Sequence, residues 1–202
     1  MFHIVVEGPT ACGKTTLINE LKRRFSEEGY SVTLHKEPTK SPWGRILTRH
    51  YKIVDQPLSQ EDEFSLSTQD REHSQHIVDK LLKIPRVGFL LQDRNYLSAV
   101  AYQGADPIHE FRRWRTPHLT ILLTASVPVL KQRMKNRVVG AGMETQVDMQ
   151  RIVNRYNTAA HTLREEGLPI IQFDTTEGFY DEQIIQEIRH WAYPFFSSVQ
   201  SR

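Results

Sequence analysis

The feature that most constrains this chain lies near its beginning, where residues 8–15 (GPTACGKT) fit the pattern G-x-x-x-x-G-K-[ST] at every required position. An apolar run, Phe2–Val6, precedes the motif, and an amphipathic stretch, Thr15–Glu28, follows it. The motif therefore stands between a strand and a helix, as a phosphate-binding loop requires. A buried strand that feeds through such a loop into a helix indicates an α/β fold.

Each residue type in this motif has a chemical purpose. Backbone N–H groups of the loop and of the helix start surround phosphate oxygens, and glycine lets the backbone approach them closely. We expect Lys14 to bridge the β- and γ-phosphates of ATP, and the Thr15 hydroxyl to ligate Mg²⁺. Cys12 is expected to be a small filler of the loop. The expected nucleotide contacts are Gly8, Ala11, Cys12, Gly13, Lys14, Thr15 and Thr16.

Short apolar runs alternate with longer amphipathic stretches along the rest of the chain. The runs are rich in Val, Ile, Leu and Phe without strict polar alternation, which is typical of strands that are covered on both faces. This order predicts an α/β fold with a mostly parallel sheet. The expected strands are 2–6, 31–35, 87–92, 119–124 and 170–173, and the expected helices are 15–28, 61–82, 127–136, 147–166 and 181–191.

Length and composition limit the classes of protein that remain. A chain of 202 residues without repeats or an evident linker favours one domain over residues 1–202. The single cysteine excludes a disulfide framework and a multi-cysteine zinc site, and 26 basic against 24 acidic residues argue against a dedicated nucleic-acid coat. The start of the chain has no export signal, and no run is long enough to span a membrane, so we expect a cytoplasmic protein.

Two strand ends carry further candidates. Asp93 and Arg94 follow the third expected strand, where a doubly wound sheet places its loops beside the phosphate loop. There Asp93 can hold Mg²⁺ through water, and Arg94 can reach an acceptor phosphate. Glu37, just after the second expected strand, can accept a proton from an attacking hydroxyl or hold the sugar of an acceptor. These positions favour a kinase among the nucleoside triphosphate-binding proteins.

Two basic segments have separate interpretations. Residues around Gly140-Ala141-Gly142 predict a mobile lid over about residues 134–148, flanked by arginines that can neutralise a transferring phosphoryl group. Arg133 and Arg137 share a helical face, so one of them is the better candidate. The cluster Arg112-Arg113-Trp114-Arg115 resembles patches that bind nucleic-acid strands, but a solvated turn with one packed Trp is the preferred interpretation.

Over residues 2–176, the chain resembles the thymidylate kinases of the nucleoside-monophosphate kinase group. The Asp-Arg…Ser…Ala-Tyr-Gln-Gly string is the most specific similarity after the phosphate loop. The resemblance rests on Glu7-Gly8 with the loop, Lys36-Glu37-Pro38, Arg71, Asp93-Arg94 through Ser98, Ala101-Tyr102-Gln103-Gly104, Arg133, Glu144, Arg151 and Tyr156.

This resemblance implies a P-loop kinase fold with a five-stranded parallel core, Mg²⁺-ATP as donor and a deoxynucleotide, by default dTMP, as acceptor. Arg71 and Arg94 would hold the phosphate or base edge of the acceptor, and Tyr102 would lie near its sugar. Arg133 would cover the adenine of ATP, and Thr175 would line the same base. Dimerisation is common in the family, so a homodimer is expected.

Three departures from the family pattern fall on the acceptor side. Thr10 replaces a carboxylate of the phosphate loop, Ala99 replaces a polar residue after Ser98, and Ser67 replaces a base-stacking Phe for which Phe64 is the candidate substitute. They motivate an alternative, a kinase of the same build that phosphorylates a hydroxyl on a deoxynucleoside or on a hydroxymethylated pyrimidine, free or within DNA. A further alternative is a non-catalytic triphosphate-binding regulatory module.

Overall fold

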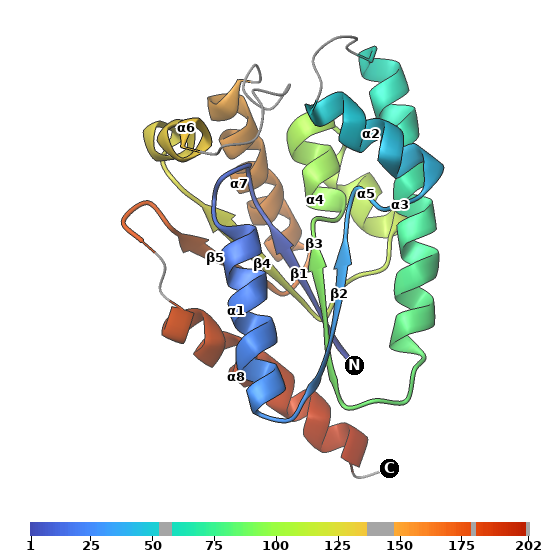
Figure 1. The fold of residues 1–202 in the computed structure, drawn as a ribbon, viewed down its shortest axis with the longest axis vertical. Coiled ribbons are helices and arrows are strands. Elements are labelled where there is room, and N and C mark those ends of the chain that lie inside the picture. Colours follow the sequence, from blue (N-terminus) through green and yellow to red (C-terminus); the bar gives the residue numbers. More distant parts are fainter. Residues whose placement is uncertain (53–57, 137–147, 179–180, 201–202) are drawn as a thin grey trace.

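The computed structural model describes residues 1–52, 58–136, 148–178 and 181–200. Its centre is a five-stranded sheet in the order β2-β3-β1-β4-β5, and every neighbouring pair is parallel. This confirms the prediction of a doubly wound, five-stranded parallel sheet, shown in Figure 1. The strands are β1 (Phe2–Glu7), β2 (Ser31–Lys36), β3 (Gly88–Asp93), β4 (Leu119–Thr124) and β5 (Ile170–Asp174).

Helices flank the sheet, and two of them, α1 and α8, lie together across one face (Figure 1). The residues expected to form the lid at 137–147, including Arg137 and Glu144, lie outside the described part of the chain. In the described residues, no helix is long and apolar enough to cross a membrane. The helices are α1 (Lys14–Glu27), α2 (Pro42–Lys52), α3 (Gln60–Leu82), α4 (Tyr96–Ser98), the π-helix η1 (Ala99–Gln103), α5 (Pro107–Arg113), α6 (Val127–Lys135), α7 (Met149–Glu165) and α8 (Asp181–Gln200).

Two apolar clusters cover the two faces of the sheet. Successive residues of a strand point to opposite faces, so Ile121 joins the cluster that includes α1 and α8, whereas Leu122 joins the one that includes α4 and α7. Strands β1, β3 and β4 are buried along their whole length. Their mostly apolar sequences reflect this double coverage, and the polar residues among them, such as His3 and Gln92, are buried as well.

The last helix is longer than the sequence predicts. The expected end at Trp191 is wrong, because α8 continues through Pro194 to Gln200. Phe196 explains the extension, since its ring is buried and stacks on Tyr30 with a centroid distance of 5.2 Å. Burial of an aromatic side chain contributes about 1.5–3 kcal/mol, which offsets the loss of a helix hydrogen bond at proline.

The register of the strands brings three chain segments to one edge of the sheet. Asp93, the last residue of β3, pairs with Val6 of β1 on one side and with Lys36 of β2 on the other. The phosphate loop therefore follows β1 at the same level at which Asp93 and Glu37 leave their strands. In doubly wound sheets, ligands bind at this carboxyl edge.

Candidate active site

The phosphate loop joins β1 to α1 in a conformation that depends on glycine. Gly8 has φ 139°, and a Cβ built there would lie 2.1 Å from the carbonyl oxygen of Leu123. No other residue type fits, because both the backbone angle and the available space exclude a side chain. The loop is thus held close to β4, with its helix start open toward a phosphate ligand.

Lys14 begins α1 and lies over the loop that precedes it. Its ammonium group donates to the carbonyl oxygens of Gly8 and Pro9, at 2.8 Å each. Thr15 and Thr16 are exposed on the first turn of α1, whereas Cys12 is fully buried in the core. The loop therefore presents one buried cation and two accessible hydroxyls at the helix N-terminus, a combination suited to a nucleotide with its metal.

Asp93 has the properties of a residue that supports a magnesium site. Its Oδ2 lies 3.4 Å from Lys36 Nζ, but its Oδ1 is buried and has no hydrogen-bond partner in the described residues. Mg²⁺ prefers oxygen ligands and is usually bound by one or two protein groups together with phosphates and water. The unpartnered Oδ1 and the Thr15 hydroxyl are oxygens of this kind, so these residues fit the ion.

Arg94 connects the phosphate loop with the helices on the other side of the site. Its backbone has φ 73°, an unusual value for a residue other than glycine, and its N–H donates to the Val6 carbonyl at 3.1 Å. The guanidinium donates to Ser98 Oγ at 3.1 Å and to Thr10 Oγ1 at 3.4 Å. It also lies over the Tyr102 ring, 5.1 Å from the centroid. The cation thereby lies between the phosphate loop and η1.

The hydroxyl of Tyr102 provides a second link to the loop. It accepts a hydrogen bond from the Thr10 backbone N–H at 3.1 Å and lies 3.3 Å from Thr10 Oγ1. Thr10, where the family pattern has a carboxylate, therefore connects the loop to η1. Ala99, at the start of η1, is buried.

A fully buried carboxylate, Glu7, fixes the segment after β3. Its Oε1 accepts from the Asn95 backbone N–H at 2.7 Å, and its Oε2 accepts from Ser98 Oγ at 2.7 Å. Burial raises the pKa of Glu7, and the hydrogen bond from Ser98 opposes that shift. The Tyr156 hydroxyl joins this group, 2.9 Å from Ser98 Oγ and 3.2 Å from the Arg94 guanidinium. The sequence alone assigns no role to Glu7 or Tyr156, although both belong to the resemblance.

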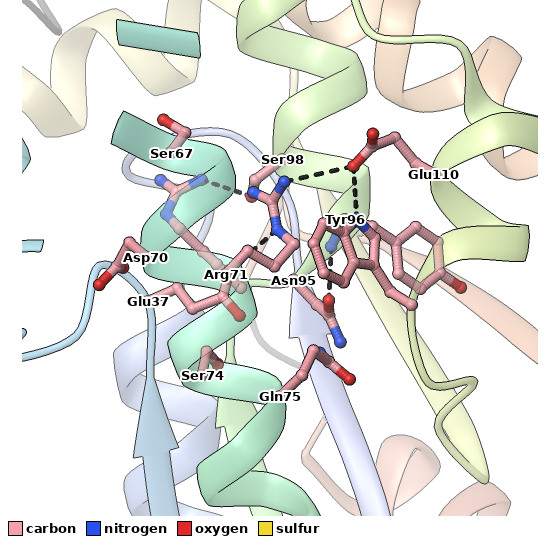
Figure 2. A network of polar contacts seen from close by, with 12 residues as sticks. Glu37, Ser67, Asp70, Arg71, Ser74, Gln75, Asn95, Tyr96, Ser98 and Glu110 are labelled. Carbon is pink, nitrogen blue, oxygen red and sulfur yellow. Dashed lines mark hydrogen bonds and ion pairs between the residues drawn. The ribbon is translucent and has the colours of Figure 1, made fainter. Parts of the chain in front are cut away.

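A buried ion-pair network lies on the acceptor side. Arg71 of α3 donates through Nε to Glu37 Oε2 at 3.2 Å and through Nη1 to Glu110 Oε2 at 3.3 Å, as Figure 2 shows. Trp114 Nε1 also donates to Glu110, at 2.7 Å. Burial raises the pKa of Glu37 to about 7, and the positive charge of Arg71 opposes that shift. Sequence reasoning missed Glu110, because only the tertiary fold brings α5 against α3.

Asp70, the residue before Arg71, holds the loop that follows Glu37. Its carboxylate is 2% exposed and accepts hydrogen bonds from the Thr39 backbone N–H at 2.8 Å, Thr39 Oγ1 at 2.5 Å and Ser41 Oγ at 2.6 Å. Gly44 packs against the same group, since a Cβ there would lie 2.5 Å from Asp70 Oδ1. Helix α3 thus positions the β2–α2 loop as well as Arg71. No local sequence pattern indicates this role of Asp70.

Two residues of α3, Ser67 and Phe64, are the candidates for the position at which the family has a base-stacking Phe, and their surroundings differ. Ser67 is buried, and its Oγ accepts from Gln103 Nε2 of η1 at 2.5 Å. Phe64, the candidate substitute for a stacking ring, is 41% exposed. The structure therefore places Ser67 within the contacts between α3 and η1, but it does not place Phe64 among the buried residues around Arg71.

On the donor side, Arg133 and Thr175 lie together beside the phosphate loop. Arg133 donates to Thr175 Oγ1 at 3.1 Å and to its carbonyl oxygen at 2.5 Å. The Thr175 hydroxyl in turn lies 3.0 Å from the Cys12 carbonyl, to which it can donate. The segment after β5 and the helix α6 are therefore both connected to the loop.

The basic cluster on α5 and the residues after it is neutralised by α3. Arg113 pairs with Glu72 at 2.7 Å, and Arg115 pairs with Asp79 at 2.5 Å. Trp114 is buried between them, with the Arg113 guanidinium 4.6 Å from its ring centroid. This is the solvated turn with a packed Trp that the sequence favours, and it removes the main reason to expect a nucleic-acid strand at this surface.

Known proteins are similar to this chain in sequence and in fold. The chain is 34% identical over 156 residues to a thymidylate kinase of Akkermansia muciniphila, which covers 72% of this chain and 73% of the relative. It is 31% identical over 173 residues to a thymidylate kinase of Xylella fastidiosa, covering 82% of this chain and 72% of the relative. The solved thymidylate kinase of Candida albicans superimposes with a TM-score of 0.71 at 18% identity, covering 96% of this chain and 91% of that one, which shows the shared fold.

The family model described as thymidylate kinase matches residues 6–179, a segment that includes the phosphate loop, Arg71, Asp93-Arg94 and Thr175. This match covers most of the chain and agrees with the resemblance that the motifs predict. The chain belongs to the thymidylate kinase family of P-loop nucleotide kinases.

Proposed function

We propose that this protein is an ATP-dependent phosphotransferase that converts dTMP to dTDP. One observation carries the proposal for the site. The Arg94 guanidinium contacts the phosphate loop at Thr10 and lies over Tyr102 of η1. A cation at this junction stands between a triphosphate on the loop and a second nucleotide held against α3 and η1. That is the position from which it can align an acceptor phosphate with the γ-phosphate.

On the donor side, we assign the phosphates of ATP to the loop amides and Lys14, with Ala11, Gly13 and Thr16 lining the loop. Thr15 and Asp93 would hold Mg²⁺, which neutralises charge on the β- and γ-phosphates when it is bound. Arg133 and Thr175 are assigned to the adenine. Phosphoryl transfer asks little covalent chemistry of the protein, so these groups act by positioning the phosphates and by balancing their charge.

On the acceptor side, we assign the phosphate of dTMP to Arg94 and the pocket for its base and sugar to Arg71, Glu37 and Tyr102. Ser98 orients Arg94 by accepting one of its hydrogen bonds. Thr10 and Ser67 replace family residues, yet both are engaged, with Tyr102 and Gln103 respectively. Two of the three departures therefore leave the acceptor side internally connected, and membership of the thymidylate kinase family supports dTMP as the acceptor.

The arrangement of Glu37 argues against the hydroxyl-acceptor alternative. One of its oxygens accepts from Arg71 and the other from Gln92. A general base for a hydroxyl needs an oxygen directed at the substrate proton, whereas an acceptor phosphate already carries an ionised oxygen and needs no base. We therefore assign Glu37 as an anchor of the acceptor pocket, not as a base. No finding supports a hydroxyl acceptor or a non-catalytic role.

Product analysis tests this function. The purified protein is incubated with Mg²⁺ and γ-labelled ATP, together with dTMP, other nucleoside monophosphates, thymidine, or DNA that contains hydroxymethylated pyrimidines. We expect label in dTDP, with dTMP giving the highest kcat/KM. Label on thymidine or on DNA, with none on dTMP, would refute the assignment.

We further propose that residues 1–202 act as one domain with a lid at about 134–148, that the protein forms a homodimer, and that it is cytoplasmic. Family membership supports each of these. Analytical ultracentrifugation at micromolar concentration tests the dimer, for which the expected mass is twice the 23.6 kDa of the chain.

A further inference from the structure

A buried chain of polar side chains runs from the first strand to the acceptor side of the candidate site. His3 Nε2 of β1 lies 2.9 Å from Gln92 Oε1 of β3. Gln92 Nε2 donates to Glu37 Oε1 at 3.1 Å and to the backbone carbonyl of Arg94 at 2.9 Å. Gln92 is 0% exposed and His3 is 1% exposed. The single amide of Gln92 therefore touches two residues of the acceptor side and, in the opposite direction, one imidazole.

The hydrogen bonds define where the side-chain N–H protons of Gln92 and His3 lie. A Gln amide has two N–H donors, and in Gln92 both are used, by Glu37 and by Arg94. Gln92 Oε1 therefore needs a donor, which must be the Nε2–H of His3. Burial lowers the pKa of His3 to about 3, so the ring is neutral and carries one proton. His3 Nδ1 is then a bare acceptor, in agreement with its having no hydrogen-bond partner in the described residues.

The two groups that Gln92 holds both need external support. Glu37 is buried; Arg71 donates to its Oε2, Gln92 donates to its Oε1, and the Ser74 side chain also hydrogen-bonds to this carboxylate. Arg94 has φ 73°, a backbone angle that residues other than glycine rarely adopt. A hydrogen bond on its carbonyl oxygen stabilises that backbone and hence the direction of the guanidinium.

A glutamine at this place is not required for packing. The neighbouring β3 residues Leu90 and Leu91 are as buried as Gln92 and are apolar. Burying an amide costs free energy unless all of its hydrogen bonds are made. Here they are made to the two acceptor-side residues, Glu37 and Arg94, and to His3.

We propose that Gln92 is a positioning residue for the acceptor nucleotide, and that His3 acts through it by fixing the orientation of its amide. The inference rests on the proposed function, since it takes Glu37 and Arg94 as acceptor-side residues. Gln92 does not contact the reacting phosphates itself. Instead, Gln92 fixes the positions of the Glu37 carboxylate and the Arg94 backbone, and these two residues bind the acceptor nucleotide.

Steady-state kinetics of Gln92→Met provide the first test. Methionine keeps the length and volume of the side chain but cannot donate a hydrogen bond to Glu37 or to the Arg94 carbonyl. We expect the KM for dTMP to rise about tenfold, as lost hydrogen bonds to a charged group imply, while the KM for ATP stays within about twofold. Thr120→Val is the matched control, since Thr120 is also a buried polar residue of the sheet, on β4. It should leave both KM values unchanged.

A double-mutant cycle distinguishes positioning from a general loss of stability. His3→Leu alone should raise the KM for dTMP about threefold, but in the Gln92→Met background it should add nothing, since its target is gone. If the residues were merely structural, the two substitutions would affect the KM values for both substrates, and their effects would add. An unchanged KM for dTMP in Gln92→Met, or an equal rise in both KM values, would overturn the inference.

Crystal structures keep this test separate from the test of the function. If the wild-type protein does not phosphorylate dTMP, the proposed function fails, but the position of Glu37 can still be compared between the wild-type protein and Gln92→Met. The inference requires that the Glu37 carboxylate or the Arg94 backbone moves in the variant. If both groups keep their wild-type positions in the variant, the inference is contradicted, whatever the acceptor is.

Discussion

The substitution Asp70→Asn tests the view that α3 organises the acceptor side. In the wild-type protein, three hydrogen bonds from the β2–α2 loop converge on the buried Asp70 carboxylate. Asparagine has the same shape but is uncharged, and one of its oxygens is replaced by a donor. It can accept from the Thr39 backbone N–H only if its NH₂ group faces the hydroxyls of Thr39 and Ser41.

The expected loss of stability follows from these contacts. Hydrogen bonds to a charged group contribute about 1.5–3 kcal/mol each and neutral ones about 1 kcal/mol, and such contributions are not additive at one site. The hydroxyls of Thr39 and Ser41 already accept from backbone N–H groups, so their protons would lose their acceptor as well. We expect a loss of about 2–3 kcal/mol, which lowers the Tm of a chain of this size by about 4–12 °C.

Thermal and urea unfolding, followed by circular dichroism, measure this loss. Asp79→Asn is the matched control, because Asp79 lies on the same helix but is 42% exposed and forms a surface ion pair with Arg115. It should cost less than about 1 kcal/mol. If Asp70→Asn unfolds at the wild-type temperature, or loses no more stability than Asp79→Asn, the reasoning about the buried carboxylate is wrong.

Further substitutions probe the donor side, the acceptor side and the buried carboxylate of Glu37. Lys14→Ala should abolish phosphoryl transfer while the circular dichroism spectrum and Tm stay close to wild type, and near-normal turnover would contradict the assignment. Arg94→Lys should lower kcat/KM for dTMP about 100-fold, because lysine cannot reproduce the forked contacts, whereas the Kd for ATP measured by calorimetry should change little. The pKa of Glu37 is raised to about 7 by burial, so its contribution to stability is present below about pH 4.5 and is lost as the pH rises through about 7. The difference in unfolding free energy between wild type and Glu37→Gln should therefore fall over that interval, and a difference that is constant with pH would refute the shift.

Most of the order of strands and helices could be predicted because local sequence patterns indicate it. Strands β1, β3 and β4 are short runs dominated by apolar residues, and α1 begins at a glycine-containing motif of fixed spacing. Helix α2 is not among the expected helices, and its first residues, Pro42-Trp43-Gly44, include proline and glycine, which are typical of turns. Gly44 is there because α2 approaches Thr39 and Asp70 so closely that a Cβ would not fit. That reason exists only in the folded protein.

The candidate site could be predicted in part for the same reason. Lys14 follows the phosphate loop that leaves β1, and Asp93 and Arg94 stand at the end of β3, so the parallel topology places all three at the same edge of the sheet. Glu110, Gln92 and Asp70 have no such signal, because their roles depend on contacts between elements that are distant in the sequence. Glu110 meets Arg71 across 39 positions, and Gln92 meets Glu37 across 55.

The contacts of Arg94 also have a thermodynamic consequence. Its guanidinium touches Thr10 of the loop that we assign to ATP, and it lies over Tyr102 on the side that we assign to the acceptor. If ATP moves Thr10, it changes the group that receives the acceptor phosphate, and the acceptor has the same access to the loop. Linkage requires the effect to be mutual, so that each substrate changes the affinity for the other by the same factor. A single arginine can thus make the binding of the two substrates cooperative within one subunit.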